Sequence, residues 1–123
     1  MHEISVAQSI VEIAEANARK QNCRCIQTIK IRLGEFTTIV PEALEFAFEV
    51  ARRGTLADDA TLEIEFVPMV TRCALCGSIR DPVRQVCLLC PKCGLPLEII
   101  SGEELQVEYI EVKSESERKE WIA

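Results

Sequence analysis

The sequence contains few aromatic residues, one histidine and no excess of positive charge. Phe, Trp and Tyr make up 5% of the 123 residues, so the core must be built from aliphatic side chains. The single histidine lies at the amino terminus, and no nucleophile–base pair is visible, which argues against a hydrolase. The formal net charge is −6, and an acidic chain repels phosphate backbones. A nucleic-acid-binding function is therefore not expected.

Long apolar runs are also missing. No stretch approaches the roughly 20 apolar residues that cross a bilayer. The first residues show neither the basic nor the apolar region of a secretory signal. We therefore expect a cytoplasmic protein with no membrane association, in which thiols stay reduced.

Hydrophobic periodicity predicts an α+β fold with a metal-bound segment inserted before its final strand. Helices are expected over residues 3–20 and from Pro41 to just before Gly54, and strands over 26–33, 61–67 and a last one through Leu105, Val107 and Tyr109. Phe46 and Val50 lie off the main apolar face of the second helix, which predicts cover on more than one side. The charged tail is expected to form a short helix ending at Trp121. The predicted buried stripe of the first helix comprises Val6, Ala7, Ile10, Val11, Ile13, Ala14 and Ala18.

Two cysteine pairs give the clearest chemical signal. They are Cys73-Ala-Leu-Cys76-Gly77 and Cys90-Pro-Lys-Cys93-Gly94. Each pair is expected to form a tight turn in which the following glycine adopts a left-handed conformation. Two such turns facing one another form a tetrathiolate site, for which Zn(II) is the first choice because it needs no redox chemistry. A site with four protein ligands has no open position, so its role is structural; iron in the same thiolates would instead make an electron carrier.

The other three cysteines leave alternatives open. Cys87 also lies two residues before Cys90, so these two could form the second pair. We favour Cys90 with Cys93, because proline and glycine suit a metal-binding turn, and interpret Cys87 as a small apolar residue beside the site, with an exchangeable ligand or redox partner as the alternative. Cys23 and Cys25 alternate along a strand and could share one soft ion, but no second pair accompanies them. Ordinary thiols are the favoured interpretation.

The amino terminus has the donors of a nickel site. The terminal amine, a backbone amide and the imidazole of His2 can close adjacent chelate rings, and such planar nitrogen donors favour Ni(II) or Cu(II). The first amides of a helix have no internal acceptor and are available for this role. Glu3 supplies a nearby carboxylate that can bind, orient or accept a proton. A terminal histidine can equally have no function, and both interpretations remain open from these residues alone.

Several segments together resemble one known family. The opening Met1-His2-Glu3 before an amphipathic helix resembles the HypA/HybF family of hydrogenase nickel-insertion proteins. The paired cysteines are similar too, and the resemblance extends over residues 1–112. The remaining matching segments are Leu33-Gly34-Glu35, Val40-Pro41-Glu42-Ala43-Leu44 with Phe46-Ala47-Phe48, Gly54-Thr55-Leu56-Ala57, and Gly102-Glu103-Glu104-Leu105.

This resemblance implies a nickel metallochaperone and not an enzyme. It implies a small mixed β-sheet packed with two helices, plus an inserted four-cysteine, zinc-ribbon-like domain. The nickel-binding domain would span 1–68, completed by the strand in 103–112; the zinc domain would span 69–102, and the tail 113–123. His2 and Glu3 would be nickel residues. The zinc ligands would be Cys73, Cys76, Cys90 and Cys93.

The resemblance also implies partners. These are a HypB-type GTPase, the [NiFe]-hydrogenase large subunit and, for some members, urease maturation proteins; the chain would be a monomer or homodimer. The alternative is a zinc-ribbon interaction or nucleic-acid module without nickel transfer.

Overall fold

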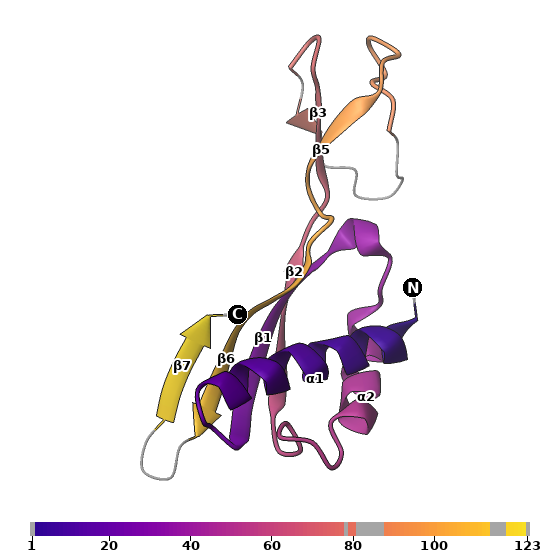
Figure 1. Cartoon of the computed structure of the whole chain (residues 1–123). Helices are drawn as coiled ribbons and strands as arrows, with labels where there is room; N and C mark the ends of the chain where they lie inside the picture. The colour runs from indigo at the N-terminus through magenta and orange to yellow at the C-terminus, as the bar shows by residue number, and fades with distance from the viewer. Residues whose placement is uncertain (1, 78, 81–87, 114–117, 123) are drawn as a thin grey trace.

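Two β-sheets, two α-helices and one short 3-10 helix make up the computed structural model, which describes residues 2–77, 79–80, 88–113 and 118–122 (Figure 1). The elements in chain order are α1 (Glu3–Lys20), β1 (Cys25–Gly34), η1 (Glu35–Thr37), α2 (Pro41–Ala51), β2 (Thr61–Val67), β3 (Val70–Cys73), β4 (Ile79–Arg80), β5 (Leu97–Ser101), β6 (Leu105–Lys113) and β7 (Arg118–Ile122). The predicted helices and long strands are confirmed to within a few residues at each end.

The larger sheet is mixed, as expected. Its strand order is β2-β1-β6-β7, with β1 parallel to β2 and antiparallel to β6. Parallel neighbours need a crossover connection, and α2 provides it between β1 and β2. The helices α1 and α2 lie together on one side of this sheet (Figure 1). The α+β class and the mixed sheet with two helices are therefore confirmed.

The core lies between the helices and the sheet and is mainly aliphatic. Six residues of the predicted stripe on α1 are buried, and Ile29, Ile31 and Leu33 of β1 lie beneath them. Ile13 was predicted to be buried but is 45% exposed, because it borders a groove between α1 and β6 that no side chain fills. The expectation that α2 is covered on more than one side is also wrong: Phe46 is 70% exposed and Val50 is 44% exposed.

The smaller sheet carries the paired cysteines. Its order is β4-β3-β5, and all its pairings are antiparallel. We call its described residues, 70–77, 79–80 and 88–101, the cysteine lobe. Figure 1 shows this lobe rising as a narrow extension from one end of the larger sheet. Short segments join β2 to β3 and β5 to β6, so the lobe is inserted between two strands of the larger sheet.

The junction between the two sheets is made of closely packed backbone. Gly34 N–H donates a hydrogen bond to the Glu104 carbonyl at 2.6 Å, and Phe36 N–H donates to the Gly102 carbonyl at 2.7 Å. A Cβ on Gly34 would overlap the carbonyl group of Gly102. Gly102 has a φ of 109°, and a Cβ there would lie 2.6 Å from the Cα of Met69. Three segments of backbone therefore cross where only glycine fits.

Two carboxylates complete this junction. Oε1 of Glu35 accepts a hydrogen bond from Met69 N–H at 2.8 Å, and Oε1 of Glu104 accepts one from Gly102 N–H at 2.7 Å. Glu35 thus ties the segment that enters the cysteine lobe to the residues after β1, whereas Glu104 fixes the turn by which the chain leaves the lobe. The lobe is joined to the rest of the chain by hydrogen bonds and not only by covalent connection.

Replacing Glu104 by glutamine should remove a stabilisation that depends on pH. Hydrogen bonds from the amides of Glu104 itself and of Gly102 hold the pKa of this carboxyl below its ordinary value. A depressed pKa in the folded state stabilises it above the unfolded pKa of about 4.3, and this contribution is lost as the pH falls through the folded value. Urea unfolding should show wild type more stable than Glu104→Gln at pH 7, with the difference shrinking below about pH 4. A difference that stays constant from neutral to acid pH would contradict this role.

The tail differs from the prediction. A strand, β7, replaces the expected helix and pairs antiparallel with β6, so β6 is not the last strand. Residues 118–122 are three charged residues followed by two apolar ones, a pattern that has neither a strand period nor a helix period, so pairing with β6 decides the structure. Among the described residues, no helix has both the length and the apolar character needed to cross a bilayer.

Candidate metal centre

The two cysteine pairs adopt the same local structure. Gly77 N–H donates to the Cys73 carbonyl at 2.8 Å, and Gly94 N–H donates to the Cys90 carbonyl at 2.7 Å. The glycines have φ values of 71° and 69°, the left-handed conformation expected from the sequence. The second turn is further held by the Cys90 N–H, which donates to the Leu95 carbonyl at 2.8 Å. Each turn therefore presents two thiols from a fixed backbone.

The four thiols converge on one point. The sulfurs of Cys73, Cys76, Cys90 and Cys93 all lie within 4.8 Å of one another. The Sγ atoms of Cys76 and Cys90 are 3.8 Å apart, which is about the edge of a tetrahedron with Zn–S bonds of about 2.3 Å. Cys73 and Cys90 are buried, Cys93 is half-buried and Cys76 is exposed at the outer side. The donor set and its spacing fit one tetrahedral soft ion.

The electrostatics of the thiols also suit a metal. The backbone amide of Cys93 donates a hydrogen bond that lowers the pKa of Cys90. Loss of hydration and the neighbouring thiols raise the pKa of Cys93 to about 12. Without an ion, four thiolates so close together repel one another, so protons are retained. A divalent cation replaces those protons and removes the repulsion.

The remaining cysteines lie apart from this group or outside the described residues. Cys23 is buried, and its thiol lies 3.4 Å from the carbonyl of Gln21, which accepts its hydrogen bond. Cys25 is half-buried at the start of β1, opposite Lys113 of β6. Neither belongs to a group of three or more possible ligands within the described ranges. Cys87 lies outside the described residues, so its pairing with Cys90 remains an open alternative.

The first turn of α1, at the amino terminus, has backbone N–H groups without acceptors inside the helix. Helix α1 begins at Glu3, and its first internal hydrogen bond runs from Val6 N–H to the His2 carbonyl at 3.1 Å. The amides before Val6 therefore have no acceptor within the helix. The exposed His2 is the N-cap residue, but its side chain makes no capping hydrogen bond. Glu3 is half-buried in the first turn; Met1, whose amine completes the expected chelate, lies outside the described residues.

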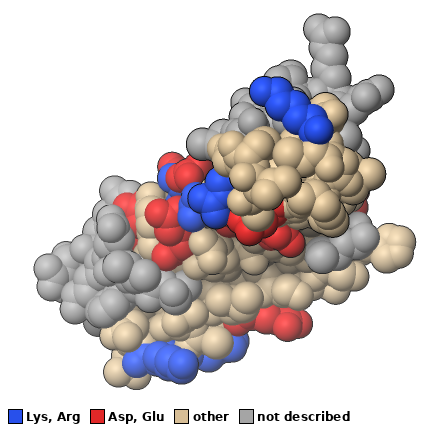
Figure 2. All heavy atoms as spheres, turned by 90° about the horizontal axis from the view of Figure 1, so that it is seen from above, with Lys and Arg blue, Asp and Glu red and all other residues tan. Residues whose placement is uncertain are grey.

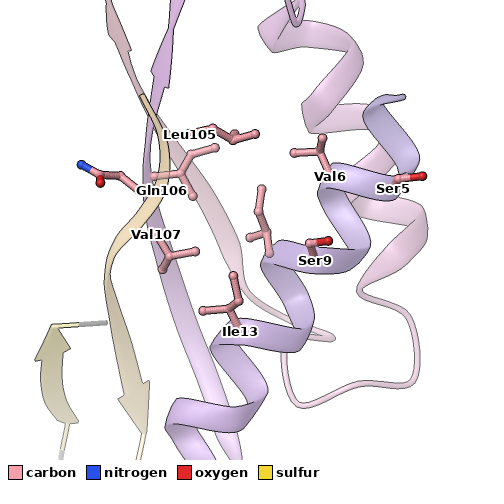
Figure 3. A pocket seen from close by; sticks show the side chains of 9 residues that line it. Ser5, Val6, Ser9, Ile13, Leu105, Gln106 and Val107 are labelled. Carbon is pink, nitrogen blue, oxygen red and sulfur yellow. The ribbon is translucent and has the colours of Figure 1, made fainter. Parts of the chain in front are cut away.

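A groove shows where this helix start lies relative to the sheets. Its volume is about 250 Å³, and Val6 and Ile13 of α1 face Leu105 and Val107 of β6 across it (Figure 3). Leu105 is the first residue of β6, directly after the junction with the cysteine lobe. The start of α1 is therefore at the end of the larger sheet from which the lobe extends. The structure does not bring His2 or Glu3 into the cysteine group; the two candidate sites are separate.

Sequence reasoning missed the roles of Glu35 and Glu104. Both carboxylates accept backbone N–H groups at the junction; the Glu35 bond to Met69 joins segments 34 residues apart, and the Glu104 bond to Gly102 is local. The sequence feature that could have indicated these two glutamates is a glycine one or two residues before each, in Gly34-Glu35 and in Gly102-Glu-Glu104. These segments contributed to the family resemblance without an assigned role.

Comparisons with known proteins agree with this geometry. A family profile described as hydrogenase/urease nickel incorporation, metallochaperone, hypA matches residues 1–112. The hydrogenase maturation factor HypA of Geobacter sulfurreducens is 41% identical over 114 residues, covering 92% of this chain and 100% of the relative. HypA of a Picosynechococcus species is 41% identical over 113 residues, covering 91% of this chain and 99% of the relative. The solution structure of the Ni metallochaperone HypA from Helicobacter pylori has a TM-score of 0.66 and 27% identity, covering 91% of this chain and 97% of that one. This chain therefore belongs to the HypA family of hydrogenase and urease nickel-incorporation metallochaperones.

Proposed function

We propose that this chain carries Ni(II) on its first residues and delivers it to the large subunit of [NiFe]-hydrogenase. The observation that carries this assignment is the free start of α1. His2 is exposed and uncapped, the first helical amides have no internal acceptor, and Glu3 lies beside them. Nitrogen donors of this kind favour Ni(II) or Cu(II) over Zn(II). A site with few ligands at the end of a chain can release its ion by ligand exchange, which suits a carrier.

We further propose that Cys73, Cys76, Cys90 and Cys93 hold Zn(II). The spacing of their sulfurs matches a tetrathiolate, and the closed ligand set leaves no position for a reacting water. Zinc would fold the cysteine lobe, which has little core of its own among the described residues. In this proposal the zinc domain spans 69–102 and the nickel domain the remainder up to 112, with the tail added to its sheet.

The proposed partners follow from the family. Delivery to a hydrogenase implies a HypB-type GTPase and the large subunit as partners in the cytoplasm, and for some members urease maturation proteins. The net charge of −6 and the absence of a basic excess support protein partners over nucleic acid. We propose that the working unit is a monomer or homodimer.

Replacing His2 by alanine should abolish tight nickel binding. The imidazole is the one side-chain nitrogen of this type in the chain, so its loss should weaken affinity beyond the roughly 10- to 100-fold seen for outer-shell partners. Isothermal titration of untagged protein with Ni(II) measures this, and elemental analysis should show unchanged zinc. One residue added before Met1 should also weaken binding, because it displaces the amine.

The matched control is Glu12→Ala, which removes an exposed acidic side chain from the same helix. It should bind nickel like the wild type. If His2→Ala also titrates like the wild type, the assignment of the nickel site is wrong.

A further inference from the structure

The outer end of the cysteine lobe carries exposed leucines. Each lies within two residues of a cysteine of the four-sulfur group. Leucine is usually buried, and four exposed within one small turn region form a distinct apolar surface. We call them the leucine tip: Leu75 (71% exposed), Leu88 (41%), Leu89 (54%) and Leu95 (44%).

The leucine tip is also unusual in charge. Residues 73–77 and 88–96 contain one charged side chain, Lys92, and no Asp or Glu, although the chain has 20 acidic residues. Figure 2, which looks down on this end of the molecule, shows a broad tan surface with both basic and acidic side chains at its margin, so the charge within the tip itself comes from Lys92. A partner surface that is apolar and bordered by carboxylates would complement it.

The tip has a fixed shape. Gly77 N–H and Gly94 N–H each donate a hydrogen bond that closes a cysteine turn, and the first of these turns carries Leu75. The segments that flank the second turn are held as well, because Leu97 N–H donates to the Leu88 carbonyl at 2.7 Å and Cys90 N–H donates to the Leu95 carbonyl at 2.8 Å. A surface that is already ordered loses little conformational entropy on binding. Apolar side chains displayed on a rigid turn are therefore suited to recognition.

The size of the tip indicates a brief contact. Four partly exposed leucines present on the order of 300 Å² of apolar surface, whereas a stable interface buries about 800 Å² per partner. A second copy of the chain would also bring Lys92 against its own equivalent. The small area and the charge therefore favour a transient protein partner over a homodimer at this surface.

The position of the tip suggests which partner this is. The start of α1 lies at the end of the larger sheet from which the lobe extends, as the groove between Val6 and Leu105 shows. We propose that the leucine tip docks transiently on the protein that receives the nickel, at an apolar patch bordered by carboxylates. This inference rests on the proposed function, because it presents the recipient to the residues proposed to carry the ion.

The test uses full-length zinc-loaded protein and the purified, nickel-free large subunit of the [NiFe]-hydrogenase from the same organism. Biolayer interferometry should show rapid, reversible binding of the wild type. Leu75→Asp should weaken binding by about tenfold or more, since it places a carboxylate in the apolar contact. Lys92→Glu should weaken binding as well, because it faces the partner's carboxylates with a like charge. Nickel titration and zinc content should match the wild type in both variants.

Phe46→Asp is the matched control, because Phe46 on α2 is 70% exposed and Leu75 is 71% exposed. It should bind the large subunit like the wild type. The docking proposal is overturned if the wild type does not bind the large subunit, if both tip variants bind it unchanged, or if Phe46→Asp loses as much as Leu75→Asp. A failure of the proposed function gives a different result. In that case His2→Ala would bind nickel with the affinity of the wild type, while the leucine tip would still bind the large subunit.

Discussion

Replacing Cys90 by serine should release zinc and unfold the cysteine lobe. Cys90 is 1% exposed and supplies both a sulfur and the carbonyl that accepts Gly94 N–H. Zinc binding in small four-ligand sites contributes about 10–16 kcal/mol, which here orders a segment with few other buried side chains. Elemental analysis should find close to no zinc, and hydrogen exchange should show loss of amide protection in β3 and β5 while β1 and β6 keep theirs.

Cys25→Ser is the control for this experiment, because this half-buried thiol is not in the four-sulfur group. It should retain one zinc per chain. A Cys90→Ser protein that still binds zinc tightly would contradict the four-cysteine site, because Cys90 is a ligand both in the favoured pairing with Cys93 and in the alternative pairing with Cys87.

Replacing Gly34 by alanine should destabilise the protein by about 3 kcal/mol or more. The added Cβ would overlap the carbonyl group of Gly102 and approach the nitrogen of Glu104 to 2.7 Å. These are backbone atoms held by the junction hydrogen bonds, so they cannot move aside as a side-chain end could. Urea unfolding monitored by circular dichroism gives the change in the free energy of unfolding.

Gly54→Ala is the control that distinguishes the loss of stability caused by steric overlap from the loss caused by a strained backbone conformation. Gly54 has a φ of 73°, but a Cβ there meets no atom within 4 Å. Replacing Gly54 by alanine should lower the free energy of unfolding by only about 1–2 kcal/mol, which is the cost of a left-handed conformation for a residue with a Cβ. Equal losses in the two variants would show that close packing at the junction contributes nothing.

The sequence predicts those features that depend on local pattern. Alternation along residues 26–33 and 61–67 and the apolar stripe of residues 3–20 correspond to observed strands and a helix. The glycines after Cys76 and Cys93 predict left-handed turns, because a Cβ is disfavoured there. The four-sulfur group follows from these two turns. Local chemistry therefore accounts for most of the fold and for the cysteine site.

Features that depend on contacts between distant segments could not be predicted. The exposure of Ile13 depends on how α1 lies against β6, and the strand in the tail depends on a free edge of β6. The role of Glu35 requires that the segment after β1 meet the segment that contains Met69. Charge and periodicity carry no information about such crossings.

The insertion of the cysteine lobe affects how the larger sheet can assemble. Val70 and Ser101 pair at the base of the lobe, so its entry and exit are neighbours. A chain that has already captured the metal therefore brings the start of β6 close to the end of β2. Once β2 has paired with β1, the loop that β6 must close to reach β1 is then short, instead of the whole segment from Pro68 to Glu104. Early capture of the proposed zinc would thus shorten the conformational search for the central strand pairing, and would accelerate folding as well as stabilise its product.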